Sequence, residues 1–129
     1  ATTMDLIRRF VVKAQAPRQA ACELSGGNQQ KLLLGKWLQL SPKLILLDEP
    51  TQGIDVGARR EIYDRLFDAC ARGAAIICAT SEFEQLEMIA HRVLVFERGR
   101  VKAELRGSAV TKSSIEQACY GETKVHEPF

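Results

Sequence analysis

Two adjacent carboxylates that follow a short apolar run are the first residues that could do chemistry. The run Leu-Ile-Leu-Leu at 44–47 leads directly into Asp48 and Glu49. A continuous apolar stretch of this length is typical of a strand buried on both faces of a parallel sheet, and its carboxyl end lies where ligands bind in open α/β sheets. Neighbouring carboxylates repel each other unless a cation or a proton lies between them. The pattern indicates a metal ligand followed by a general base, with a pair of capping acids as the alternative.

A serine and two glycines ahead of a leucine-rich run form the second feature. Ser25, Gly26 and Gly27 precede "NQQKLLLGKWLQL", which predicts a helix over residues 28–40. A helix N-terminus offers backbone N–H groups and positive potential, and glycines let an anion come close to the backbone. Taken alone, the segment is either an anion site or an ordinary helix entry.

Strands and helices are expected to alternate along the rest of the chain. The pattern predicts helices at 3–13, 56–72, 82–91 and 114–120, strands at 44–48 and 74–80, and a hairpin at 92–105 that turns near Arg98 and Gly99. Apolar periodicity places three sets of side chains inward: Leu6, Ile7, Phe10 and Val11; Leu33, Leu34, Trp37, Leu38 and Leu40; Ile62, Leu66, Phe67 and Cys70. This order predicts an α/β layer structure with right-handed crossovers.

Composition limits the function classes only loosely. The 129 residues carry 18 basic and 16 acidic side chains, a net charge of +2 that gives no argument for nucleic acid as a partner. No apolar run approaches the roughly 18 residues of a membrane-spanning helix. The four cysteines form no CxxC pair, which disfavours a zinc site.

The two candidate motifs, in this order and at this spacing, resemble the ATP-binding cassette (ABC) ATPases. "LSGGNQQ" at 24–30 is similar to the signature motif of that family, "LILLDE" at 44–49 to Walker B, and "QGID" at 52–55 to the D-loop. The resemblance covers residues 20–105. It implies the C-terminal half of a P-loop NTPase core with a mostly parallel sheet, together with the end of the helical signature subdomain.

The resemblance also implies roles for individual residues. Ser25, Gly26, Gly27 and Gln29 would contact the γ-phosphate of an ATP molecule that a second ATPase domain holds. Asp48 would hold Mg²⁺, Glu49 would be the catalytic base, and Gly53 and Asp55 would belong to the D-loop. Ser81 stands at the switch position where most members have histidine, which predicts a degenerate site in this domain.

The individual residues within and around these motifs narrow the resemblance to one group of importers. "GGNQQK" with "EPTQGIDVGA" looks like the second ATPase domain of bacterial ribose, galactose or xylose importers, although Gln52 stands where that group usually has arginine. The implied partners are a second ATPase domain, transmembrane permease subunits and, indirectly, a periplasmic sugar-binding protein. The implied location is the cytoplasmic face of the bacterial inner membrane. We expect three parts: the helical subdomain at 1–40, the ATPase core at 41–107, and a helix and tail at 108–129.

A phosphate loop of the form G-x-x-x-x-G-K-[ST] is not found in the 129 residues. The expectation is therefore a fragment whose N-terminal half lies upstream, which is inactive alone and associates with itself through uncovered strand edges. Two alternatives stay open at this point. One is the C-terminal lobe of a chromosome-maintenance or DNA-repair ABC ATPase, and the other is a truncated remnant without catalysis.

Overall fold

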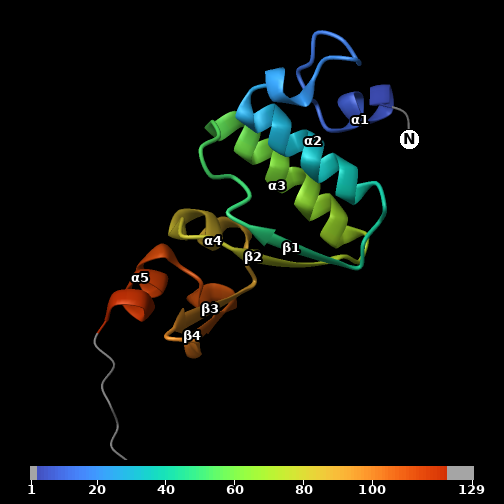
Figure 1. The fold of residues 1–129 in the computed structure, drawn as a ribbon. Coiled ribbons are helices and arrows are strands. Elements are labelled where there is room, and N and C mark those ends of the chain that lie inside the picture. The colour runs from blue at the N-terminus through green and yellow to red at the C-terminus, as the bar shows by residue number, and fades with distance from the viewer. Residues whose placement is uncertain (1–2, 122–129) are drawn as a thin grey trace, which may run out of the picture. The chain divides into compact units, whose positions relative to one another are not determined.

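The computed structural model describes residues 3–121, which fold as two compact units. The boundary between the units along the chain lies between Ala79 and Thr80. The first unit holds α1 (Thr3–Arg9), a 3₁₀ turn (Ala21–Glu23), α2 (Gly26–Leu38), β1 (Leu44–Asp48), α3 (Val56–Ala71) and β2 (Ala75–Ala79). The second holds α4 (Phe83–Ile89), β3 (Arg92–Glu97), β4 (Arg100–Arg106), a 3₁₀ turn (Gly107–Ala109) and α5 (Lys112–Tyr120) (Figure 1). The predicted polar tail from 122 lies outside the described residues, and the predicted division into three parts stays a prediction.

A parallel pair of strands is the centre of the first unit. β1 and β2 pair in register from Leu44 opposite Ala75 to Asp48 opposite Ala79. Helices α2 and α3 lie side by side on one face of this pair (Figure 1). Ile45 points to that covered face and is 7% exposed. The predicted α/β class with a parallel sheet is confirmed.

The opposite face of the β1–β2 pair is open within the first unit. Leu44, Leu46 and Ile77 are 53%, 69% and 60% exposed. The expectation that both strands are buried on both faces is therefore wrong for the described residues. The apolar run was correctly read as a parallel strand, but α2 and α3 cover only one face of the pair.

The inward faces of the helices are narrower than the periodicity predicts. Leu34 and Leu38 of α2 and Ile62 and Leu66 of α3 are buried, as expected. Others on the predicted faces are exposed: Leu33, Trp37, Leu40 and Phe67. Leu33, Trp37 and Phe67 lie on helices of which a neighbouring helix covers only a stripe of the surface, and Leu40 lies beyond the end of α2.

The first helix is shorter than predicted. It ends at Arg9 instead of continuing to residue 13, and Val11 has a φ of 50°, which no α-helix accepts. Val11 is consequently exposed, while Phe10 and Val12 are buried against the rest of the unit. The turn at residues 10–13 thus replaces the predicted last turn of helix.

Two glycines let α2 pack closely on its neighbours. A Cβ atom on Gly27 would lie 2.8 Å from Cβ of Ala58 on α3, and one on Gly35 would lie 2.7 Å from the ring of Phe10. Real Cβ atoms do not come this close to other carbons. Both glycines are buried, and both are required by the separation of the elements they join.

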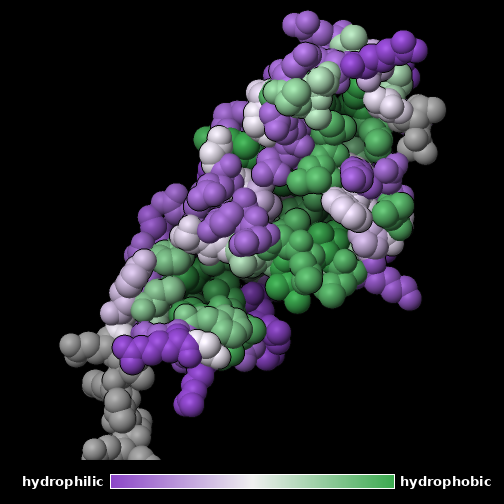
Figure 2. All heavy atoms as spheres, viewed as in Figure 1, coloured by the Kyte–Doolittle hydropathy of each residue, from purple (hydrophilic) through white to green (hydrophobic). Residues whose placement is uncertain are grey.

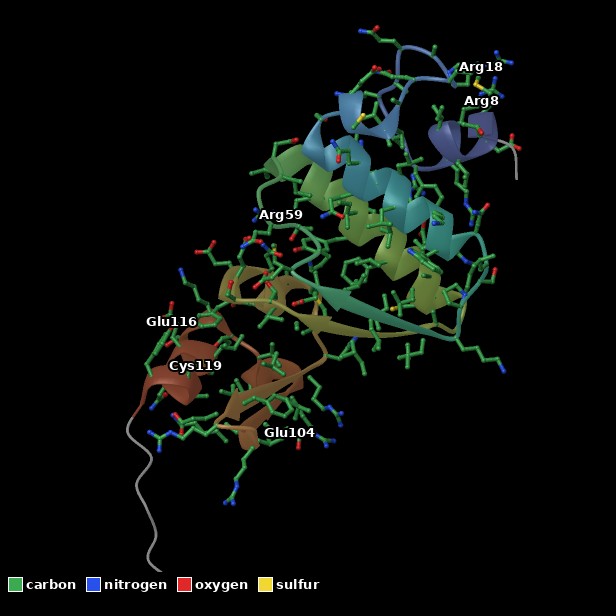
Figure 3. The ribbon with its side chains drawn as sticks, viewed as in Figure 1. Arg8, Arg18, Arg59, Glu104, Glu116 and Cys119 are labelled. Atoms are coloured by element: carbon green, nitrogen blue, oxygen red, sulfur yellow. The ribbon has the colours of Figure 1, made fainter. Side chains whose placement is uncertain are left out.

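The second unit is a hairpin covered by two helices. β3 and β4 are antiparallel and turn at Arg98 and Gly99, both with positive φ, as predicted. Helix α5 packs on the hairpin, with Ile115 only 1% exposed among the buried side chains of β3. Glu104 of β4, which is labelled in Figure 3, forms ion pairs with Arg106 and Arg92. These two arginines hold the pKa of the Glu104 carboxyl below its ordinary value.

Substitution of Gly27 by alanine tests the close approach of α2 to α3. The added methyl group overlaps Ala58, so we expect a loss of about 1–3 kcal/mol in the free energy of unfolding, as for other overpacked sites. Gly26→Ala is the matched control, because its Cβ would meet only Ile54 at 4.0 Å. Urea denaturation measures both, and restoration of stability by Gly27→Ala with Ala58→Gly should follow. Equal stability of the two single variants would contradict this close packing of α2 on α3.

Candidate functional site

The predicted anion-binding segment lies at the N-terminus of α2. Ser25 is the residue before the first turn, and Gly26 and Gly27 are its first two helical residues. Ser25 and Gly26 are exposed, whereas Gly27 is buried against α3. Gln29 is exposed and its side-chain amide donates to the carbonyl of Leu24, 2.8 Å away. An anion could therefore approach Ser25, Gly26 and Gln29, while the absence of a side chain at Gly27 is already needed for helix packing.

Two residues that the sequence reasoning missed support this segment from behind. Asn28 accepts a hydrogen bond from the backbone N–H of Lys13 and donates one to Ser25 Oγ, both at 2.8 Å. Lys31, 4% exposed, donates to the carbonyl of Val11 at 2.7 Å and pairs with Glu61 of α3 at 2.6 Å. The one available signal was the position of Asn28 inside the motif, because nothing in the sequence connects Lys31 with Glu61, 30 residues away.

The two candidate carboxylates lie where β1 ends. Asp48 is the last residue of the strand and is exposed. Glu49 is half-buried, has a φ of 42°, and its N–H donates to the carbonyl of Ala79 at 2.8 Å. A left-handed conformation is uncommon for a residue other than glycine and costs free energy, which neighbouring contacts must offset. The backbone bond to β2 holds Glu49 in that conformation and turns the chain out of the sheet.

The predicted D-loop leads into α3. Gly53 has a φ of 72°, and nothing lies within 4 Å of the position its Cβ would take, so backbone conformation is the reason for glycine there. Asp55 caps α3, and its Oδ1 accepts from the N–H of Ala58 at 2.9 Å. That hydrogen bond, further N–H groups of residues 55 and 57, and the charge of Lys13 lower the pKa of the Asp55 carboxyl. Asp55 therefore has a structural task whether or not it has another.

The fold brings some of the predicted residues together. The N-termini of α2 and α3 are adjacent, because a Cβ on Gly27 would lie 3.6 Å from the Asp55 carboxylate. Asp48 and Glu49 lie at the carboxyl edge of the β1–β2 pair. Ser81 is exposed just before α4 and belongs to the second unit. In Figure 3, Arg59 lies in the N-terminal part of α3, the same end as Asp55.

An apolar groove runs between α2 and β1. It has a volume of about 670 Å³ and includes the exposed side chains of Leu33, Trp37 and Leu46. Figure 2 shows apolar residues gathered on this part of the first unit. Its lining is unsuited to binding a nucleotide phosphate, since among its residues only Asp48 is charged.

A magnesium ion fits the carboxylate pair only with help from other ligands. Among residues 3–121, no group of three histidine, cysteine or acidic side chains could hold a metal ion. Mg²⁺ is commonly bound by one or two carboxylates together with water and substrate phosphates, so an exposed Asp48 at the sheet edge could supply the protein ligand.

Among residues 3–121, no helix is long and apolar enough to cross a membrane.

The pKa of the Cys78 thiol depends partly on the charges of Asp48 and Glu49. Burial raises the pKa of Cys78, and the negative charges of Glu49 and Asp48 raise it further. Because the thiolate is the reactive form, alkylation of Cys78 should have its pH midpoint above that of an ordinary cysteine. Replacement of the pair by Asp48→Asn and Glu49→Gln lowers the pKa, so the midpoint should move to lower pH. Mass spectrometry after timed iodoacetamide treatment of residues 1–129 measures it.

The exposed Cys22 is the internal control for this experiment. Its alkylation rate at each pH should be the same in the wild-type chain and in the double variant. A midpoint for Cys78 that does not move would place the two carboxylates too far from the thiol to affect it.

Comparison with known proteins finds one matching family and relatives whose names are those of import ATP-binding proteins. Residues 8–80 match the family described as "AAA domain, putative AbiEii toxin, Type IV TA system". The ribose import ATP-binding protein RbsA of Bacillus subtilis is 42% identical over 110 residues, which are 85% of this chain and 22% of that protein. Ribose import ATP-binding protein RbsA 2 of Burkholderia cenocepacia is 40% identical over 98% of this chain and 26% of that protein. The chain thus spans about a quarter of these relatives' length.

Solved structures show the same fold. A nucleotide-free ATP-binding cassette from an ABC transporter has a TM-score of 0.76 and 23% identity, covering 89% of this chain and 45% of that one. An ATP-binding subunit of an ABC transporter has a TM-score of 0.70 and 27% identity, covering 81% and 43%. These neighbours confirm the predicted partial P-loop NTPase core, and the relatives do not favour the chromosome-maintenance or repair alternative.

The residues matched by the family are more than half of the 129, and they contain both the segment at the start of α2 and the carboxylate pair at the end of β1. The relatives, the solved cassettes and the motifs agree on one assignment. The chain belongs to the family described as "AAA domain, putative AbiEii toxin, Type IV TA system", and it is similar to part of the ATP-binding proteins of ABC transporters.

Proposed function

We propose that residues 1–129 are part of the ATP-binding subunit of an ABC sugar importer. The observation that carries the proposal is the start of α2, where Ser25, Gly26 and Gln29 are accessible at a helix N-terminus while Gly27 is buried behind them. The identity of about 40% to ribose import ATP-binding proteins supports the sugar class. The full-length protein would be an ATPase that powers transport.

In the proposed reaction, the start of α2 contacts an ATP molecule held by a second ATPase domain. Ser25, Gly26 and Gln29 would contact the γ-phosphate, and the helix N-terminus would stabilise the charge of that phosphate. Gly27 would act by allowing close packing and by offering its N–H group. Asp55 and Gly53 would shape the neighbouring loop at the same interface.

The carboxylate pair would serve a phosphate held by another part of the protein. Asp48 would hold Mg²⁺ with water and the nucleotide phosphates, and Glu49 would accept a proton from the attacking water. Ser81 at the switch position makes hydrolysis at this site weak. Residues 1–129 alone, which include no G-x-x-x-x-G-K-[ST] segment, would not turn over ATP.

The proposed partners follow from that assignment. They are the N-terminal half of the same ATPase domain, a second ATPase domain, transmembrane permease subunits and, through these, a periplasmic sugar-binding protein. The protein would lie at the cytoplasmic face of the bacterial inner membrane. A dimeric ABC transporter cassette among the solved neighbours supports pairing of two ATPase domains, since its fold is the same as this one.

Transport by the full-length protein should depend more on the start of α2 than on Glu49. Gly26→Asp adds a negative charge at an exposed position where a Cβ meets nothing nearer than 4.0 Å, so it should abolish sugar uptake without harming the fold. Glu49→Gln should be milder, because its site is degenerate at Ser81. Uptake of labelled ribose in cells that carry each variant measures the difference.

Ser25→Arg should match Gly26→Asp, since it places a bulky side chain at the same exposed N-terminus. Gly27→Asp is unsuited to this test, because any side chain at that position overlaps Ala58. Equal loss of uptake in Gly26→Asp and Glu49→Gln would contradict the proposed division of roles.

The isolated chain should associate with itself. Within residues 3–121, β2 pairs only with β1 and β3 only with β4, so each keeps an edge that another strand could extend. The exposed side chains of Leu44, Leu46 and Ile77 add an apolar face beside one of these edges. Sedimentation of residues 1–129 over a wide concentration range should show species larger than a monomer.

Leu46→Lys should shift that equilibrium toward monomer, because a charge would then have to be buried in the contact. Met88→Lys on α4 is the matched control, with a side chain that is 64% exposed in the other unit, and should leave association unchanged. A monomer at every concentration, with slow amide exchange along β2 and β3, would show that the chain closes its own edges.

A further inference from the structure

The hydroxyl group of Ser25 is used in an unusual way for the residue that starts a helix. A serine at this position ordinarily accepts a hydrogen bond from an N–H group in the first turn. Ser25 makes no such bond with its side chain. Its Oγ instead accepts from Nδ2 of Asn28, 2.8 Å away and one turn along the helix.

The orientation of the Asn28 amide is fixed by its other partner. Asn28 Oδ1 accepts from the backbone N–H of Lys13 at 2.8 Å. A backbone N–H can only donate, so the amide oxygen must face Lys13 and the NH₂ group must face Ser25. Asn28 is 9% exposed, and water therefore competes little for either bond.

The segment that holds the amide oxygen is itself fastened to α2. Lys31 is one turn beyond Asn28, and its ammonium group donates to the carbonyl of Val11 at 2.7 Å while it pairs with Glu61 at 2.6 Å. Phe10 packs against the face of α2 that Gly35 leaves open. Rotation of the Asn28 amide would break the bond to Lys13 without offering that N–H another acceptor.

The consequence is a defined direction for the Ser25 proton. Because Oγ accepts from the NH₂ group, the hydroxyl hydrogen cannot point at Asn28 and is left for a partner outside the helix. Ser25 is exposed at the N-terminus of α2, where the potential already favours an anion. An outward O–H donor is the form of serine that binds a phosphate oxygen.

We propose that Asn28 is a positioning residue that presents the Ser25 hydroxyl as a hydrogen-bond donor to a phosphate group. The proposal rests on the proposed function, in which Ser25 contacts the γ-phosphate of ATP. It assigns to Asn28 an effect on catalysis that passes entirely through Ser25. Asn28 itself is turned toward Lys13 and Ser25 and does not contact the nucleotide.

Asn28→Asp in the full-length protein is the direct test. Aspartate has the same shape and keeps an oxygen for the Lys13 N–H, but it replaces the donor to Ser25 by an acceptor. The Ser25 proton then turns inward to the carboxylate. We expect kcat for ATP hydrolysis to fall about 10- to 100-fold, as when a charge-assisted donor is lost, and Ser25→Ala should cause a similar fall.

A double-mutant cycle separates positioning from the effect of the added charge. In the Ser25→Ala background, Asn28→Asp should lower kcat by less than about threefold, because the hydroxyl through which it acts is gone. Inhibition by ADP, which has no γ-phosphate, should be unchanged in all three variants. Gln39→Glu at the far end of α2 is the matched control for an amide-to-carboxylate change and should leave kcat unchanged.

Each outcome of the cycle decides one question. A full further loss from Asn28→Asp in the Ser25→Ala background, after Ser25→Ala has itself lowered kcat, would overturn the positioning role and leave the proposed function intact. No loss from Ser25→Ala would overturn the proposed contact with the γ-phosphate, and the positioning role with it. Near-equal losses in the two single variants with no further loss in the double variant would establish the role of Asn28.

Discussion

The close approach of α2 to α3 is the constraint on which the rest of the first unit depends. Gly27 lies against Ala58, and no larger side chain fits between them. This contact sets the two helix N-termini beside each other, with Asp55 capping one and Ser25 starting the other. Both helices then lie on the same face of the β1–β2 pair. A motif that reads as a flexible glycine pair is therefore also a packing device.

Buried polar bonds make that arrangement specific. An apolar contact between helices tolerates small slides, but the bonds of Asn28 and Lys31 are directional and are shielded from water. The pair of Lys31 with Glu61 joins α2 to α3, and the bond to Val11 joins α2 to the turn after α1. Removal of one partner would leave a buried charge or donor, which costs more than a lost apolar contact. The start of α2 is thus held both by α3 and by the turn after α1.

The end of β1 is held in a different way. The N–H of Glu49 extends the hydrogen bonds of the parallel pair one residue beyond the strand, and the left-handed backbone there directs the following loop toward α3. Gly53 makes a second left-handed turn before Asp55 begins the helix. The carboxylate pair and the cap of α3 are consequently joined by a short and well-defined loop. Their negative charge is felt by Cys78 on the neighbouring strand, where it raises the pKa of the thiol.

The sequence by itself determined the order of the elements, the fold class and the family resemblance. Local patterns suffice for these, because a short apolar run such as "LILLD" between turn residues is typical of a parallel strand, and "LSGGNQQK" combines residue types that are characteristic of one motif. It also located the turn at Arg98 and Gly99, since a tight hairpin requires positive φ there. Relatives with about 40% identity agree with the resemblance.

Only the tertiary structure decided which faces are covered and which polar groups meet. Trp37 and Leu46 have apolar side chains in periodic positions, yet both are largely exposed because the groove that they line between α2 and β1 is open. The partners of Lys31 are 20 and 30 residues away, and no local pattern encodes such pairs. The direction of the Ser25 hydroxyl likewise depends on Lys13, a residue outside the motif. Periodicity records how a side chain points from its own helix, whereas burial and hydrogen bonding depend on what lies opposite.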